Sequence, residues 1–166
     1  MTDRLDMPEY VWRAELLAKV ILTRRSDIEV RHPVRPWDLL VELLEGESHT
    51  GQVFAVEVGA TLRPEGFGRA DENGEVAVRA EWRHKLRVEV ERAKDTPFPV
   101  CFVGFAMTTD QGYFAWIRRP VRDGTSEGLV TELPEHLFPF TNEVVDDIVT
   151  SVREWYRQRR HHAAAG

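Results

Sequence analysis

The stretch GQVFAVEVGAT, residues 51–61, alternates its side chains between two faces, and between residues 53 and 60 both faces are apolar apart from Glu57 and Gly59. The pattern predicts a strand, because successive side chains in a strand point to opposite sides. A strand that is apolar on both faces is expected inside a sheet that is covered on both sides. A carboxylate in such a strand needs a partner, since an unpaired buried charge is costly. The partner of Glu57 could be an arginine or a bound cation.

Strand patterns also flank this segment. Residues 27–34 and 38–45 are predicted strands, and a glycine-containing loop would join 38–45 to 51–61 as a hairpin. Residues 99–107, PVCFVGFAM, are almost wholly apolar and follow a proline-rich turn, which is typical of a central strand. Residues 112–119 should pair with that strand through a short loop. Residues 62–75 are rich in glycine, proline and polar residues and are predicted to form a loop.

Three segments have helical periodicity: residues 8–24, residues 80–94 and residues 141–158, with Thr141 as the N-cap of the last. The tail, residues 159–166, is expected to be frayed. The first helix is apolar around most of its circumference, so we expect it to be largely buried. The apolar residues that indicate this are Tyr10, Trp12, Ala14, Leu16, Leu17, Val20 and Ile21.

The order of these elements predicts one domain over residues 1–166, with a core over residues 8–120. A helix, three strands, a helix, two strands and a helix fit an α/β/α sandwich, with a mixed sheet of about five strands flanked by helices. The crossover helix at 80–94 should make strand 99–107 parallel to the strand at 51–61.

Composition narrows the class of protein. The chain is 42% hydrophobic and 30% charged, and it has no apolar run of the roughly 20 residues that cross a membrane. Its first residues lack the pattern of a secretory signal, so a cytoplasmic location is expected. A single cysteine, Cys101, excludes an internal disulfide and a cysteine-based metal site. The net charge of −6 does not favour broad, non-specific binding to nucleic acid.

Two carboxylates are candidates for a metal site. Asp38 opens one predicted strand, and Glu57 lies inside the next, so a hairpin can bring them together near one edge of the sheet. Two carboxylates and a backbone carbonyl, such as that of Val58, form a ligand set that suits Mg²⁺ or Mn²⁺. The alternatives are a strand-end role for Asp38 and a buried ion pair for Glu57.

Together these residues resemble a known group of enzymes. AELLAKVILTRRSDIEVRHPVRPWDLLVEL (14–43) and GQVFAVEV (51–58) resemble the restriction-endonuclease-like PD-(D/E)XK superfamily. That core has a helix with a glutamate, an aspartate opening a strand, and a following strand with (D/E/Q)-x-K. EWRHKLRVEVERAKDTPFPVCFVGFAM (81–107) and GYFAWIRR (112–119) are similar to a bacterial domain-of-unknown-function branch of it. The resemblance covers about residues 10–120.

The resemblance implies a role for several residues. Glu15 would match the acid on the first helix, and Asp38 and Glu57 would bind the metal, Mg²⁺ or Mn²⁺. The implied activity is metal-dependent cleavage of DNA or RNA, often in bacterial defence. The departure is Gly59, which stands where the motif has the lysine that positions the attacking water and offsets charge at the phosphate.

A lysine from another element could replace the missing one. Lys85, on the predicted helix 80–94, is the best substitute by position, although it could equally be a solvated lysine among other basic residues. Lys19 is explained by an (i, i+4) pair with Glu15.

Three functions therefore stay open. The sequence favours a catalytically degenerate nuclease-like domain, a pseudoenzyme that acts as a nucleic-acid-binding or assembly subunit in a bacterial defence-type system. Such a subunit could have a protein partner or form a homodimer, and no membrane contact is expected. The alternative is an active nuclease in which Glu15, Asp38, Glu57 and Lys85 carry the chemistry. The third possibility is an α/β domain in which the resemblance is accidental.

Overall fold

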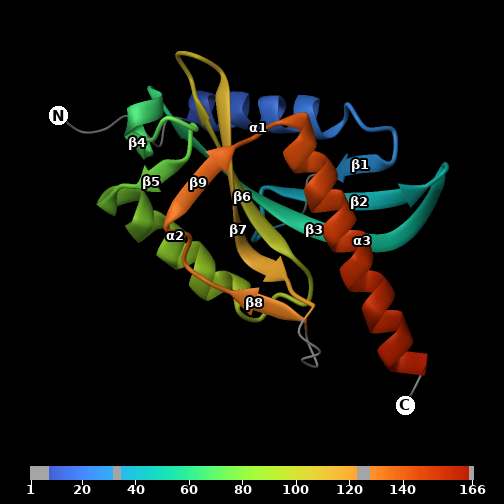
Figure 1. Ribbon diagram of the computed structural model, residues 1–166. Coiled ribbons are helices and arrows are strands. Elements are labelled where there is room, and N and C mark those ends of the chain that lie inside the picture. Colours follow the sequence, from blue (N-terminus) through green and yellow to red (C-terminus); the bar gives the residue numbers. More distant parts are fainter. Residues whose placement is uncertain (1–7, 32–34, 123–127, 165–166) are drawn as a thin grey trace.

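A computed structural model describes residues 8–31, 35–122 and 128–164 (Figure 1). The helices are α1 (Pro8–Leu22), α2 (Ala80–Ala93) and α3 (Asn142–Ala164), with a short 3₁₀ helix, η2 (Pro64–Gly66). The strands are β1 (Ile28–Arg31), β2 (Leu39–Glu45), β3 (Ser48–Thr61), β4 (Gly68–Ala70), β5 (Val76–Val78), β6 (Val100–Ala106), β7 (Gln111–Pro120), β8 (Leu129–Thr131) and β9 (His136–Pro139).

The strands form one mixed sheet with the order β1-β2-β3-β6-β7-β9-β5-β4, and β8 also pairs with β7. β2 and β3 form the predicted antiparallel hairpin, and β6 is parallel to β3 as the crossover helix required. The expected number of about five strands is wrong, because the described residues form nine. The additional strands β4, β5, β8 and β9 have three or four residues each. They are too short for an alternating pattern to be recognised, so only the turn residues beside them can be identified from the sequence.

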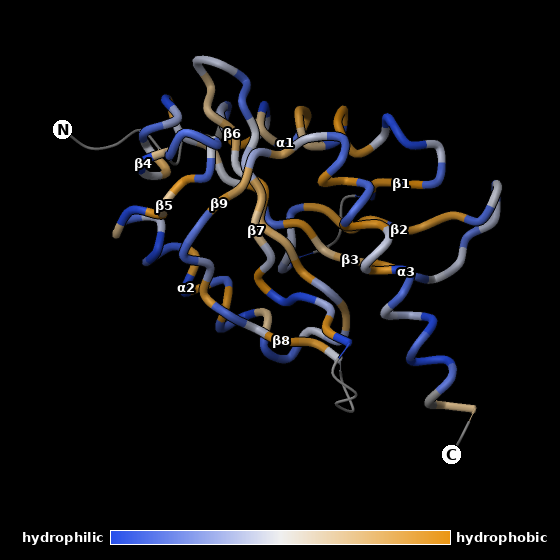
Figure 2. Tube along the Cα trace, viewed as in Figure 1, coloured by the Kyte–Doolittle hydropathy of each residue, from blue (hydrophilic) through white to orange (hydrophobic). Residues whose placement is uncertain are grey.

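Helices cover both faces of the sheet. Buried residues of α1 and α3 pack with Phe54, Val56 and Val58 on one face of β3. The apolar stripe of α2 packs on the opposite face with Ala55 and Phe102. In Figure 2 the central strands are mostly hydrophobic, whereas the C-terminal half of α3 is mostly hydrophilic. The sheet is therefore the middle of three layers.

The prediction that α1 is buried around most of its circumference is wrong. Ala14, Ala18 and Leu22 are buried. Trp12, Leu16 and Val20 are 63%, 39% and 56% exposed. These two sets lie on different sides of the helix, and a helix that packs on a single layer buries only the side that faces it. The described residues leave the second apolar stripe uncovered.

α3 begins where Thr141 caps it: the Thr141 hydroxyl accepts a hydrogen bond of 3.3 Å from the Val144 N–H. The helix continues to Ala164, beyond residue 159 where the frayed tail was expected to begin; residues 165 and 166 lie outside the described part. Alanine and arginine favour helix, which outweighs the polar character of this tail. In the described part of the chain, none of the helices is long and apolar enough to span a membrane.

One side chain joins α3 to β3. The Tyr156 hydroxyl donates to the carbonyl oxygen of Val53 at 2.8 Å and accepts from the Val53 N–H at 3.0 Å. Both backbone groups of Val53 thus have a partner outside the sheet. Val53 lies within β3, the strand against which the other elements pack.

We expect Tyr156→Phe to lower the free energy of unfolding by about 1–3 kcal/mol, because two part-buried backbone groups lose their partner. Tyr113→Phe is the matched control. The Tyr113 ring is buried, but its hydroxyl forms no hydrogen bond with the described residues, so its loss should change stability by less than about 0.5 kcal/mol. Urea unfolding of the three proteins measures both changes. Equal stability for Tyr156→Phe and the wild type would contradict the role of this contact.

Candidate active site

The candidate site lies where β3 loses one of its two neighbours. β2 pairs with β3 only up to the Leu39–Val56 pair, whereas β6 pairs with β3 as far as Thr61. Residues 57–61 therefore have an open edge on the β2 side. Asp38, just before β2, fills part of this edge: its Oδ2 accepts a hydrogen bond of 2.8 Å from the Val58 N–H.

Glu57 shares this edge with Asp38, as the hairpin argument predicted. The two carboxyl groups are close enough to form a side-chain hydrogen bond. The second Glu57 oxygen, Oε2, is buried and has no hydrogen-bond partner among the described residues. The pKa of Glu57 is raised to about 9, mainly by burial and then by the nearby charges of Asp38 and Glu89, which outweigh the opposite effect of Arg92. At neutral pH, Glu57 therefore holds a proton in a site that a cation could also occupy.

The backbone adds a third oxygen to this pair. In a strand, the N–H and C=O of one residue point to the same side. Because the Val58 N–H points to Asp38, the Val58 carbonyl also points to the open edge. Two carboxylates and a carbonyl are ligands that Mg²⁺ and Mn²⁺ accept. The described residues contain no group of three or more His, Cys, Asp or Glu arranged to hold a metal ion.

A cleft of about 380 Å³ runs along this open edge, between the edge, α1 and α2. Both Glu57 and Lys85 line it, and Asp38 lies beside Glu57, so the structure brings together three of the four predicted site residues. Asp38 is not among the lining residues and contacts the cleft through Glu57. Val11 of α1 also lines the cleft, and Glu15 lies one turn further along the helix, half-buried and outside the lining.

The space beside Gly59 is filled by aromatic rings. A β-carbon at this position would lie 2.7 Å from Cη2 of Trp82 and 2.8 Å from the ring of Phe102. A lysine at residue 59 would therefore not fit. The ammonium nitrogen of Lys85, one turn beyond Trp82 on α2, lies 4.9 Å from the centre of the Trp82 ring. This distance allows a cation–π contact that holds the ammonium at the cleft.

Glu89 belongs to the same site, although it is not among the residues predicted from the sequence. It lines the cleft one turn after Lys85, and its side chain is 16% exposed. Burial raises its pKa, and the charge of Asp38 raises it further, whereas Arg92 lowers it. Glu89 Oε2 lies 2.9 Å from Arg92 Nη1, which also donates to the Pro36 carbonyl at 3.3 Å. The available signal was its (i, i+4) spacing from Lys85 beside the apolar stripe of α2.

No protein-family model, no curated protein and no solved structure matches the chain.

Glu57 should make stability depend on pH. Its pKa is about 9 in the folded protein and ordinarily 4.5, so the folded state binds the additional proton between these values. The free energy of unfolding should thus fall as the pH rises from 4.5 to 9, by at most about 1.4 kcal/mol per pH unit. Glu57→Gln cannot ionise and should make this slope shallower, leaving the part that Glu89 contributes, whereas the exposed Glu81→Gln should keep it unchanged. Denaturant unfolding at several pH values tests this, and an equal slope in wild type and Glu57→Gln would refute it.

The packing at residue 59 gives a second test. Gly59→Ala should lower the free energy of unfolding by about 1–3 kcal/mol, because the methyl group overlaps the Trp82 and Phe102 rings. In a Trp82→Phe background, which removes Cη2, the same change should cost about 1 kcal/mol less. A Leu86→Ala background is the control and should leave the cost unchanged. The same cost in all three backgrounds would mean that Trp82 does not close this position.

Proposed function

We propose that the chain is a divalent-cation-dependent phosphodiesterase that cleaves nucleic acid, with Lys85 in place of the motif lysine. The observation that carries the proposal is the half-buried Asp38–Glu57 carboxyl pair on a cleft that Lys85 also lines. Glu57 Oε2 has no hydrogen-bond partner among the described residues, and the pair carries a proton where a cation would serve equally well.

The residues present suit Mg²⁺ or Mn²⁺. Asp38, Glu57 and the Val58 carbonyl would hold the ion, with all three oxygens at the open edge of β3. When bound, such an ion polarises a phosphate oxygen and lowers the pKa of a coordinated water. Binding requires Glu57 to give up its proton, so affinity should increase with pH.

Lys85 has the charge and the location to act on the phosphate. Its ammonium group would contact a non-bridging phosphate oxygen and stabilise the negative charge that develops during cleavage. Trp82 closes the position of the motif lysine and supports the Lys85 ammonium at the same cleft. Arg92, which pairs with Glu89 on α2, donates to the Pro36 carbonyl and would hold α2 against the turn before Asp38.

A second candidate is the degenerate domain that binds nucleic acid or a partner protein without cleaving. The specific observation in its favour is the occupied space at Gly59, which rules out the ordinary position of the lysine. This function and the active one predict the same metal site but opposite results for cleavage. The defence-type context stays a proposal for both.

Calorimetry with Mn²⁺ and Mg²⁺ and incubation with single- and double-stranded DNA and RNA separate the two. We expect Asp38→Asn with Glu57→Gln to abolish metal binding and cleavage. Lys85→Ala should keep metal binding and lose about 100-fold or more in cleavage rate, as the loss of a charge-stabilising group does elsewhere. Lys94→Ala is the matched control, since Lys94 lies at the end of α2 and pairs with Glu91 at 2.7 Å.

Each outcome has a definite meaning. Metal binding by the wild type without cleavage of any nucleic acid would support the degenerate domain. Cleavage that Lys85→Ala leaves intact would refute the role of Lys85. Metal binding that survives the double substitution would refute the site itself.

A further inference from the structure

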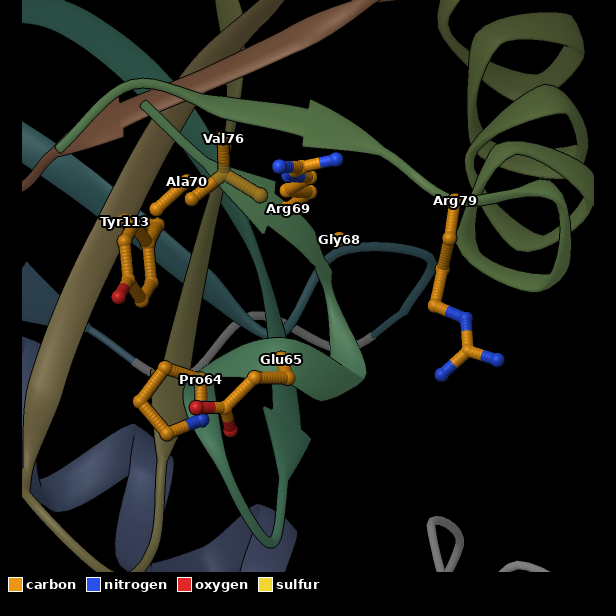
Figure 3. A pocket seen from close by; sticks show the side chains of 8 residues that line it. All are labelled: Pro64, Glu65, Gly68, Arg69, Ala70, Val76, Arg79 and Tyr113. Atoms are coloured by element: carbon orange, nitrogen blue, oxygen red, sulfur yellow. The ribbon is translucent and has the colours of Figure 1, made fainter. Parts of the chain in front are cut away.

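A second hollow, of about 480 Å³, lies away from the carboxyl pair, where η2, β4, β5 and β7 meet the start of α2. Figure 3 shows the side chains that line it. This volume is in the range of small-molecule sites. Its floor is apolar, with Val76 buried beneath it, and charged side chains surround the floor.

Tyr113 gives the first sign that this hollow binds a ligand. The residue is only 2% exposed, yet it lines the hollow, and its hydroxyl has no hydrogen-bond partner among the described residues. The hydroxyl oxygen is open to the hollow, so a ligand there can reach it. The Glu65 carboxylate is close enough to raise the pKa of Tyr113, after the larger effect of burial. One end of the hollow therefore presents a hydroxyl and a carboxylate (Figure 3).

The other end of the hollow is positively charged. Arg69 pairs with Ala77 across β4 and β5, and Arg79 lies two residues beyond Ala77, so the arginines are diagonal neighbours. Arg69 forms no hydrogen bond or ion pair with another described residue. Among the described residues, the one ion-pair contact of the Arg79 side chain is to Glu81, at 3.8 Å. Both arginines line the hollow, so an anion in it has two guanidinium groups in its surroundings.

The N-terminus of α2 adds to this positive end. Arg79 is the N-cap of a 14-residue helix, and no side chain caps it by a hydrogen bond. The first N–H groups of α2 are therefore available to an anion, and the helix dipole favours negative charge there. Arginine binds phosphate through two parallel hydrogen bonds, which makes phosphate the anion that suits this end best.

We propose that the hollow is a binding site for a nucleoside monophosphate. The phosphate lies between Arg69 and Arg79 at the N-terminus of α2, the flat part of the molecule covers Val76, and the base donates hydrogen bonds to Glu65 and Tyr113. Guanine fits the carboxylate best, because one edge of the base presents adjacent N–H and NH₂ donors. The site is separate from the carboxyl pair and does not depend on it.

The test is titration of the full chain by calorimetry with guanosine 5′-monophosphate, inosine 5′-monophosphate and inorganic phosphate. Guanosine monophosphate should bind most tightly, inosine monophosphate more weakly because it lacks the amino group, and phosphate most weakly. Arg69→Ala and Arg79→Ala should each lower the affinity for guanosine monophosphate about 10- to 100-fold, as the loss of a charged hydrogen bond does. Tyr113→Phe removes one oxygen from a buried residue and should lower this affinity about 3- to 10-fold.

Two controls separate this site from the proposed nuclease. Arg83→Ala removes an exposed arginine of α2 that does not line the hollow and should leave binding unchanged. Asp38→Asn with Glu57→Gln should also leave it unchanged, whether or not the chain cleaves nucleic acid. The nucleotide in this site could be a free molecule or the 5′ end of a nucleic-acid strand. A 5′-phosphorylated trinucleotide that begins with guanosine distinguishes these two sources. Tighter binding than guanosine monophosphate would identify a strand end, and weaker binding would identify a free nucleotide.

Three results would overturn the proposal. The first is no binding of guanosine monophosphate at millimolar concentration. The second is equal affinity for phosphate and for guanosine monophosphate, which would leave no role for the base. The third is binding that none of the Arg69, Arg79 and Tyr113 substitutions changes.

Discussion

The position of β3 is the constraint on which the other elements depend. Helices cover both of its faces, β6 pairs along one edge, and β2 pairs along the other edge only as far as Val56. The five residues after Val56 therefore carry backbone groups that the sheet does not satisfy on one side. Asp38 satisfies the Val58 N–H and lies against Glu57 for the same reason. The candidate site is thus a consequence of where one strand stops.

Steric and electrostatic effects agree at this edge. The Trp82 and Phe102 rings that close the space at Gly59 also make the surroundings of Glu57 apolar. An apolar environment raises the pKa of the carboxyl group and strengthens its interaction with any cation nearby. The same indole ring faces the Lys85 ammonium. Aromatic residues on α2 and β6 thus fill the space beside Gly59, and the Trp82 ring also holds the Lys85 ammonium at the cleft.

The sequence predicted the parts of this structure that have a clear period. The two-sided apolar pattern of residues 51–61 and the stripe of Trp82, Leu86 and Val90 are regular enough to identify β3 and α2. The short strands were missed, because three residues contain no period. The exposure of Trp12 was missed, since composition does not say which side of α1 meets the sheet. Glu89 needed the packing of α2 to be known, as its spacing alone equally fits a solvated helix face.

The parallel pairing of β3 with β6 has a consequence for how the chain folds. The hairpin of β2 and β3 is local, whereas β6 begins almost 40 residues after β3 ends, with α2 between them. Contacts that close such long loops form more slowly than hairpins. The carboxyl groups of Asp38 and Glu57 can therefore meet in water before α2 covers them. At neutral pH, Glu57 is ionised while it is in water and protonated once α2 covers it. The last step of folding is therefore coupled to the binding of one proton from solvent.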